Sequence, residues 1–233
     1  MQRDCRFRSR RAVLEVLVSA VLVAGACGAA AGETRSLSSV AGAAEGPAEG
    51  PPQSHPIADA FPLVFDAEWV RLDVLGDTLQ VGGTFHFLCR EPVTGSIPLL
   101  FPFPSDSLLG GARMVSLGFR AGGDTTVPGR WEEVPGDRGV RWWMPPCPGD
   151  SLVAEFVYRQ GIRAEYACYV VTTARIWGRP LRYAEFEIRL PAGAQPTGFS
   201  YPFEPREARG ADCYVYETED FFPDRDIVVR WRR

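Results

Sequence analysis

The sequence contains no lysine and no asparagine, so all 25 of its positively charged side chains are arginines. Without lysine there is no lysine Schiff base and no lysine general base, and without asparagine there is no N-glycosylation acceptor or asparagine oxyanion donor. Both absences are typical of a GC-rich genome, so the abundance of arginine is a codon effect before it is a binding signal. The formal net charge of -4 disfavours a dedicated nucleic-acid binder, which normally gathers basic side chains on one face.

Histidine is also scarce, with only His55 and His86 in the chain. His86 lies between two phenylalanines in a segment with strand periodicity, and no Gly-x-Ser-x-Gly motif accompanies it. The sequence therefore favours an ordinary surface role for His86 over a Ser-His-Asp or Cys-His arrangement. It also offers too few histidines for a histidine-based metal site, and no cofactor is predicted.

Residues 1–27 have the order of a secretory signal: arginines, then a short apolar run, then small residues that end at Cys27. The apolar run has roughly 15 residues, whereas a helix that spans a bilayer needs roughly 20. The segment therefore predicts export, to the periplasm, to a membrane surface or to the medium, rather than a permanent membrane-spanning helix.

Two details of this leader leave alternatives open. Arg10 and Arg11 precede the apolar run as in the twin-arginine motif, whose substrates are exported folded, but neighbouring arginines also occur in ordinary signals. The stretch 24–27 resembles a bacterial lipobox, although Ala24 stands where a larger aliphatic residue is usual. Lipidation of Cys27 would anchor the protein to a membrane, whereas cleavage nearby would release a soluble protein.

Residues 28–60 are rich in Ala, Gly, Pro, Ser and Glu and have very few large apolar side chains. Such a stretch cannot bury enough apolar surface to offset the entropy cost of ordering it, so we predict a disordered tether. The remaining residues, 61–233, form one predicted domain that is large enough to have its own hydrophobic core.

Strand periodicity dominates this predicted domain. Along 182–190, apolar residues alternate with Tyr183 and charged residues, as in a strand with one face on a core. The same alternation occurs at 70–74 and 226–232, and turn signals separate further candidate strands. These further candidates are 78–90, 112–120, 140–144, 151–160, 165–174 and 212–217. About eight to ten short strands predict an all-β fold, an antiparallel β-sandwich that is Ig-like in the broad sense.

Glycine and proline add local detail to this fold. Gly82-Gly83 inside a strand pattern predicts a bulge or a sharp bend. The prolines of segment 97–104 lack an N–H donor, so this segment is expected to run extended along a sheet edge or across the sandwich. They also disfavour an outer-membrane barrel, whose strands need about 10 residues with a continuous apolar face.

Four of the six cysteines lie in the predicted domain, and an even number in an exported chain favours two disulfides. We predict the pairs Cys89–Cys147 and Cys168–Cys213. The alternative is that some of the four are buried thiols. No Cys-x-x-Cys motif suggests a zinc ribbon or a redox site.

Acidic residues near the C-terminus form the one dense cluster of hard oxygen ligands, and calcium prefers such ligands. The candidates are Glu217, Glu219, Asp220, Asp224 and Asp226. Their spacing is not that of an EF-hand loop, and Phe221-Phe222-Pro223 divides them. A solvated acidic loop is therefore the preferred interpretation, with calcium as the alternative.

Trp142 and Trp143 are adjacent in a predicted strand, so their side chains must point to opposite faces. Together with Trp177, and close to several arginines, they are candidates for an exposed aromatic surface that stacks on a glycan or contacts a protein. The alternative is that these rings fill the core and pack beneath arginine side chains.

The preferred functional interpretation is a non-catalytic, exported protein of the cell envelope whose sandwich binds a protein or glycan partner. No nucleic-acid partner is expected, and membrane contact is expected only through a lipid anchor. Two alternatives stay open. One is a hydrolase of an envelope polymer that uses carboxylates such as Glu155, Glu185 or Glu187, and the other is a calcium-stabilised structural domain.

Overall fold

The computed structural model describes residues 61–121, 125–136, 139–207 and 212–233. The predicted signal segment, the lipidation candidate Cys27 and the predicted tether 28–60 lie outside these residues and stay predictions. Most of the described chain is β-strand. The strands are β1 (Leu63–Leu75), β2 (Thr78–Cys89), β3 (Ile97–Pro102), β4 (Leu109–Ala121), β5 (Val127–Pro128), β6 (Arg130–Val134), β7 (Gly139–Met144), β8 (Ser151–Ile162), β9 (Tyr166–Tyr169), β10 (Leu181–Leu190), β11 (Gln195–Phe199), β12 (Glu204–Arg206), β13 (Asp212–Phe221) and β14 (Ile227–Arg232). One short 3-10 helix, η2 (Thr172–Trp177), follows β9.

Eight strands form one large sheet in the order β12-β13-β10-β1-β2-β8-β4-β5. Its long central strands pair antiparallel, except that β1 and β10 run parallel. A parallel pair needs a long crossover connection, which here contains β2 to β9 and η2. The large sheet is therefore the frame on which the rest of the chain packs.

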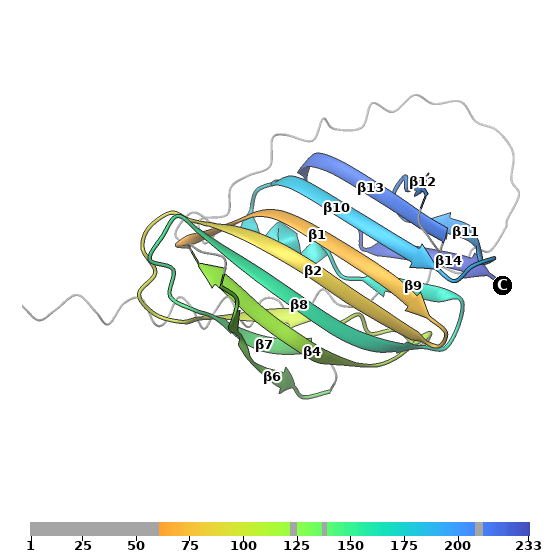
Figure 1. Ribbon diagram of the computed structural model, residues 1–233, viewed down its shortest axis with the longest axis horizontal. Coiled ribbons are helices and arrows are strands. Elements are labelled where there is room, and N and C mark those ends of the chain that lie inside the picture. The colour runs from red at the N-terminus through yellow and green to blue at the C-terminus, as the bar shows by residue number, and fades with distance from the viewer. Residues whose placement is uncertain (1–60, 122–124, 137–138, 208–211) are drawn as a thin grey trace, which may run out of the picture.

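The second layer consists of two separate three-stranded sheets, β11-β14-β9 and β3-β7-β6. Figure 1 shows both of them behind the large sheet, the first behind β10 and β13 and the second behind β4 and β8. The predicted all-β sandwich is confirmed, with the added feature that one of its two layers is divided.

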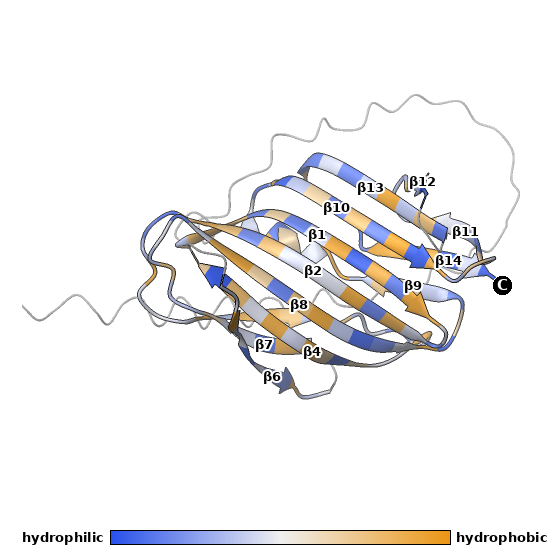
Figure 2. Cartoon of the chain, viewed as in Figure 1, coloured by the Kyte–Doolittle hydropathy of each residue, from blue (hydrophilic) through white to orange (hydrophobic). Residues whose placement is uncertain are grey.

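Alternation of side chains along each long strand explains why the sheet has one buried face. In β10, Ala184, Phe186 and Ile188 are fully buried, whereas Glu185 and Glu187, in the opposite phase, are partly exposed. Figure 2 shows the same alternation of apolar and polar residues along the other strands of the large sheet. One continuous hydrophobic cluster joins all three sheets, and each large side chain in it contributes roughly 1.5–3 kcal/mol by burial.

Aromatic rings fill the space between the layers. Phe156 of β8 lies 4.8 Å from Phe101 of β3, and Phe85 of β2 lies 5.9 Å from Trp142 of β7, measured between ring centroids. Under the other small sheet, the ring of Tyr169 in β9 lies 6.4 Å from that of Phe186. Each small sheet is thus held to its own half of the large one by edge-on and tilted aromatic contacts.

The predicted bulge at Gly82-Gly83 is wrong, because β2 pairs with both neighbours through these residues without a shift of register. Gly83 is required for a different reason: a Cβ there would lie 2.5 Å from the ring of Phe156. The bulge between β1 and β2 lies instead between Phe65 and Ala67.

Two further predictions concern segments at the edges. Residues 97–102 form β3 at the edge of its sheet, as its prolines predict. The predicted strand 165–174 is only partly correct, since β9 ends at Tyr169 and a 3-10 helix begins at Thr172. The Asp226 carboxylate accepts hydrogen bonds from the backbone N–H groups of Val171 and Thr172, which favours a helical turn there.

Candidate functional site

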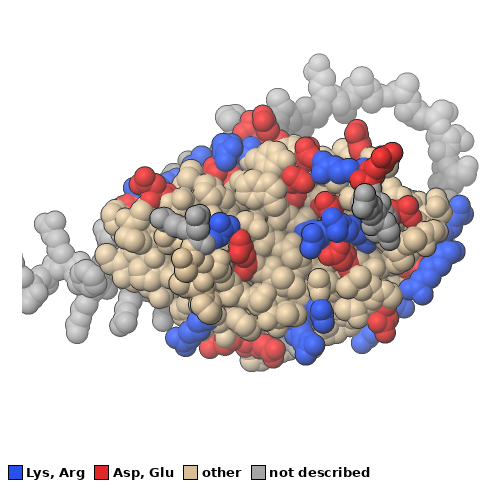
Figure 3. Space-filling model, in the orientation of Figure 1, with Lys and Arg blue, Asp and Glu red and all other residues tan. Residues whose placement is uncertain are grey.

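One face of the large sheet is turned away from both small sheets, and we call it the outer face. Strand pairing places its side chains in rows that cross the sheet. One row runs through Glu217, Glu185, Trp69, Thr84 and Glu155, on β13, β10, β1, β2 and β8 in turn. Figure 3 views this face and shows acidic and basic side chains intermingled on it. No described layer covers it.

Ion pairs connect most of the charged side chains on the outer face. The Arg206 guanidinium hydrogen-bonds to Glu217 and lies 3.6 Å from the Glu185 carboxylate. On the same face, between β10 and β1, Arg189 contacts Glu187 and its guanidinium lies 3.9 Å from the Asp73 carboxylate. The Arg120 guanidinium lies 2.6 Å from Glu155 near the opposite edge. The charges therefore compensate one another locally, and exposed pairs of this kind stabilise the fold by at most about 1 kcal/mol each.

Trp69 is the exposed aromatic residue at the centre of this face. Its side chain is 38% exposed, and its ring lies 5.7 Å from that of Tyr183, tilted by 40°. The Tyr183 hydroxyl donates a hydrogen bond to the Glu185 carboxylate at 3.1 Å. Burial and this hydrogen bond raise the pKa of Tyr183 to about 12, so the hydroxyl remains a donor at neutral pH. Trp69 and Tyr183 thus form an aromatic pair set among polar groups.

A second polar group on this face joins β1, β2 and β10. The Asp66 carboxylate lies 3.0 Å from His86 Nδ1 and 2.9 Å from Arg182 Nη2. Burial alone would raise the pKa of Asp66, but the hydrogen bonds from Arg182 and His86 outweigh it and hold the pKa below its usual 3.8. His86 therefore takes part in a three-residue polar group with Asp66 and Arg182.

A buried carboxyl group lies directly behind the outer face. Glu68 points from β1 into the core, where it is 1% exposed, and its Oε2 is 3.5 Å from the Tyr169 hydroxyl. Its other oxygen has no hydrogen-bond partner among the described residues. Burial raises the pKa of Glu68 to about 8, so the carboxyl is mostly protonated at neutral pH. Burial and the nearby Glu68 also raise the pKa of Tyr169.

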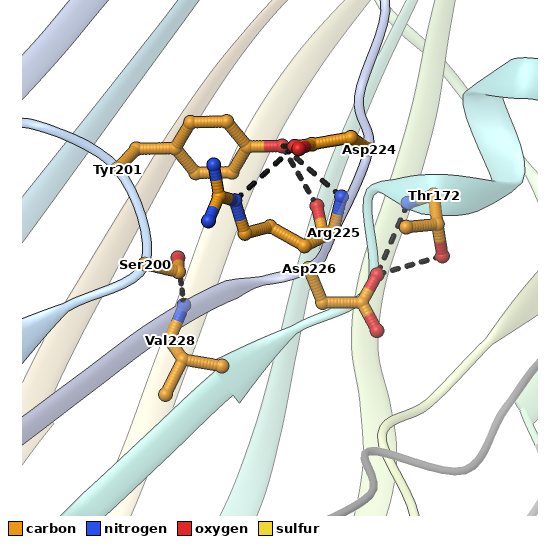
Figure 4. Close-up of polar contacts among 7 residues, drawn as sticks. All are labelled: Thr172, Ser200, Tyr201, Asp224, Arg225, Asp226 and Val228. Atoms are coloured by element: carbon orange, nitrogen blue, oxygen red, sulfur yellow. Dashed lines mark hydrogen bonds and ion pairs between the residues drawn. The ribbon is translucent and has the colours of Figure 1, made fainter. Parts of the chain in front are cut away.

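The calcium candidates do not converge on a common point. Glu217 projects onto the outer face beside Arg206. Figure 4 shows that Asp224 accepts a hydrogen bond from the Tyr201 hydroxyl and that Asp226 accepts one from Thr172 Oγ1, at 2.7 Å, and one from the Thr172 backbone N–H. Asp226 also accepts one from the backbone N–H of Val171. Among the residues that the structure describes, no group of three His, Cys, Asp or Glu side chains is arranged to hold a metal ion. Glu219 and Asp220 complete the acidic end of β13. This arrangement favours a structural role for the acidic segment.

The three tryptophan candidates do not form a common surface. Trp142 is 2% exposed and packs against Phe85 and Phe101, so its candidacy as a partner-binding residue is wrong. Trp143 points the opposite way, as predicted from adjacency, and the Arg130 guanidinium covers it at 4.1 Å from the ring centroid. Trp177 packs at the edge of the core, 5.3 Å from the ring of Phe61.

The cysteine predictions are half correct. Cys89 and Cys147 form a disulfide with an S–S distance of 2.21 Å, which confirms that pair. The predicted pair of Cys168 and Cys213 is wrong, since both remain as buried thiols. Cys168 lies in β9 of the second layer, whereas Cys213 is paired in register with Arg189 on the outer phase of β13. The large sheet therefore separates the two sulfur atoms.

The carboxylates named for the hydrolase alternative all lie on the outer face. Two strands, β1 and β2, separate Glu185 from Glu155, so their backbones are about 14 Å apart at a strand spacing of about 4.8 Å. Glycoside hydrolysis requires carboxyl groups roughly 5–9.5 Å apart. Glu185 does lie beside Glu217, but the Arg206 guanidinium forms ion pairs with both carboxylates.

The aromatic pair Trp69–Tyr183 and the buried Glu68 are not among the candidates predicted from the sequence, although the strand patterns contain evidence for both. Trp69 shares the polar phase of β1 with Arg71 and Asp73, and Tyr183 shares the polar phase of β10. An aromatic ring in the charged phase of an amphipathic strand predicts exposure. Conversely, continuing the buried phase back from Val70 places Glu68 in the core, where a carboxyl group is unusual.

No known family model matches this chain, and no curated protein sequence matches it. Its fold is similar to that of a Legionella pneumophila protein for which nutrient binding has been suggested. That match has a TM-score of 0.51 and 14% identity, and it covers 72% of this chain and 66% of that one. An M1 zinc metallopeptidase from Deinococcus radiodurans matches with a TM-score of 0.43 and 17% identity over 72% of this chain and 42% of its own length.

The chain thus spans less than two thirds of the length of these solved structures. At such identities the similarity concerns the fold alone. Within the described ranges, the structure contains no helix that is both long and apolar enough to cross a membrane.

Proposed function

We propose that this chain is a non-catalytic, exported protein of the cell envelope, and that its sandwich binds a partner through the outer face of the large sheet. The observation that carries this proposal is the exposed Trp69, which lies on a central strand of a sheet face that no described layer covers. Exposed aromatic residues are enriched where proteins contact their ligands.

Two further observations support a binding role. The outer face is rigid, because it is formed by long paired strands whose opposite side is anchored in the core, and rigid elements hold binding groups more accurately than loops. Nutrient binding has been suggested for the Legionella protein of similar fold, which agrees with a binding role. The hydrolase alternative has less support, because Arg206 lies between Glu185 and Glu217.

Export is the first part of the proposal to test. The intact mass of the protein isolated from the cells that produce it defines its mature N-terminus. A mature chain that begins at Cys27 with added acyl chains supports a lipid anchor, and an unmodified chain that begins near residues 28–32 supports a released protein. A retained, unprocessed leader would contradict export.

Binding through the outer face can be tested by filling it. Thr84 lies next to Trp69 on β2, so Thr84→Arg places a long side chain over the centre of the face. Cosedimentation of the exported protein with isolated cell envelopes, in detergent that removes any contribution of acyl chains, should fall at least tenfold. The matched control, Thr197→Arg at an exposed position of β11 in the second layer, should bind like the wild type. Equal binding by all three proteins would contradict the proposal.

A further inference from the structure

The aromatic pair on the outer face has the shape of a small platform. Trp69 and Tyr183 lie on the neighbouring strands β1 and β10, with ring centroids 5.7 Å apart. Ala67, on the same phase of β1, is paired in register with Tyr183 and carries only a methyl group. Small side chains continue on β2, where Thr84 is paired with Trp69 and Gly82 with Arg71. The exposed indole therefore stands above its neighbours on the β2 side.

Hydrogen-bonding groups surround this platform. The Glu185 carboxylate and the Thr84 hydroxyl flank Trp69 directly, one on each neighbouring strand. Side chains directly opposite each other on paired strands have Cβ atoms about 4.5–5.5 Å apart. A ring that stacks on the indole can therefore reach an acceptor on one side and a hydroxyl on the other. Along β1, Arg71 donates its Nε–H to Asp73 and keeps its other guanidinium N–H groups as donors.

The exposed apolar area is too small for the centre of a protein interface. Trp69 is 38% exposed, which leaves on the order of 100 Å² of an aromatic surface of roughly 250 Å². A stable protein interface buries about 800 Å² on each partner around a continuous apolar centre. The other large apolar side chains that are exposed among the described residues lie on separate elements: near the ends of β1 and β2, at the irregularity in β4, on the edge strand β5 and in η2. These are Leu75, Leu88, Val115, Val127 and Ile176.

The charges on this face also disfavour a charged ligand. Arg206 is engaged by Glu185 and Glu217, and Arg189 by Glu187 and Asp73. Arg71 also contacts Asp73, so the guanidinium groups closest to the platform already have counter-ions. An anionic or cationic partner would have to displace these pairs. An uncharged ligand with many hydroxyl groups meets the same side chains as donors and acceptors without breaking them.

We propose that Trp69 and Tyr183 form a stacking site for an uncharged glycan of β-linked, gluco-configured pyranose rings. Such rings have equatorial hydroxyl groups and flat faces of C–H groups, so one ring face can stack on the indole while its edge hydroxyls bond to Glu185 and Thr84. This inference rests on the proposed function, because it specifies the ligand of the same face.

The test is a calorimetric titration of the full exported protein with chitotetraose and cellotetraose, two uncharged β-linked probes. At least one of them should bind at millimolar concentration or below, and raising NaCl from 50 to 500 mM should change the affinity less than about twofold, because no net charge is neutralised. Trp69→Ala should weaken binding at least tenfold, and Trp69→Phe should restore most of the affinity. Trp143→Ala, which removes a partly exposed tryptophan of the second layer, should bind like the wild type.

The outcomes separate the glycan from other partners. If neither probe binds the wild-type protein, or if Trp69→Ala binds as well as the wild type, the glycan site is overturned. In that case, loss of envelope binding by Thr84→Arg would still support the outer face, with a protein as its partner. Affinity that collapses at high salt would also overturn the proposal, since it would indicate a charged ligand.

Discussion

The two faces of the large sheet shift the pKa of similar side chains in opposite directions, as two carboxyl groups on β1 show. Asp66 lies on the outer side, where Arg182 and His86 hydrogen-bond to it and hold its pKa below the usual value. Glu68, two residues later, lies in the core beside Tyr169, and burial raises its pKa to about 8. The same chemical group is therefore charged on one face and mostly neutral on the other at neutral pH.

This difference separates the residues that hold the fold together from those available for binding. The inner face is almost entirely apolar, and its aromatic rings determine how the two small sheets dock. On the outer face the charged side chains form exposed ion pairs, which contribute little to the stability of the fold. Side chains on this face can therefore be substituted without loss of the fold. Substitutions on the two faces should therefore differ in size and in pH dependence.

The largest effect is expected from truncating the inner face. Phe186 is fully buried and its ring lies 5.5 Å from that of Phe221, so Phe186→Ala should lower the free energy of unfolding by about 3–5 kcal/mol. The neighbouring outer-face variant, Glu187→Ala, should lower it by no more than about 1 kcal/mol. Urea unfolding followed by circular dichroism measures both. Similar losses in the two variants would show that the faces are not distinct.

The next effect concerns the pH dependence that Glu68 imposes. Below about pH 4.5 the carboxyl is protonated in both the folded and unfolded chain; between 4.5 and about 8 the unfolded chain ionises it while the folded chain keeps it protonated. The wild type should therefore lose stability as pH rises through this window. Since one pKa unit corresponds to about 1.4 kcal/mol, the loss is a few kcal/mol at most.

Glu68→Gln removes this proton linkage and keeps the size of the side chain. Relative to the wild type, the variant should gain roughly 2–4 kcal/mol of unfolding free energy between pH 5 and pH 8, with no further gain above pH 8. Urea midpoints measured at intervals of one pH unit provide the comparison. A stability difference that is independent of pH would show that Glu68 is not protonated in the folded protein.

The outer carboxyl should give the opposite slope. The folded pKa of Asp66 is lowered, so its contribution is complete above the usual value of 3.8 and is lost as pH falls through the lowered pKa. Asp66→Asn should cost about 1 kcal/mol at pH 7, because the exposed Arg182 is screened by solvent, and should cost less in strong acid. The same urea series measures it, and a penalty that grows as pH falls would contradict the assignment.

Features of the fold that depend on neighbouring residues could be predicted from the sequence, whereas features that depend on residues distant in sequence could not. Strand phase is local, so the alternation around Val70 and along β10 predicts both faces correctly, and the prolines predict the edge position of β3. The division of the second layer into two sheets and the parallel β1–β10 pair depend on contacts between distant segments, and periodicity carries no information about these.

The candidate site shows the same limit. The adjacency of Trp142 and Trp143 predicts that one of the two is exposed, but only the phase of β7 shows that Trp142 is the one in the core, beside Phe85 and Phe101. The exposure of Trp69 can be predicted from its phase in β1. Its contact with Tyr183 cannot, because Tyr183 is distant in sequence and lies beside Trp69 only because β1 pairs with β10. The Cys89–Cys147 disulfide is predicted correctly. The sequence does not show that Cys168 and Cys213 lie in different layers, because this depends on how the strands pair.

The smallest effect is expected from an isolated ion pair on the outer face. Arg120 and Glu155 are 2.6 Å apart, with side chains 33% and 42% exposed, so solvent screens most of their attraction. Arg120→Gln should change the free energy of unfolding by at most about 0.5 kcal/mol at 50 mM NaCl, and the difference should vanish at 1 M NaCl. Urea unfolding at the two salt concentrations checks this. If the variant instead loses more than about 2 kcal/mol of unfolding free energy at both salt concentrations, the pair contributes substantially to stability. The outer face would then also have a structural role.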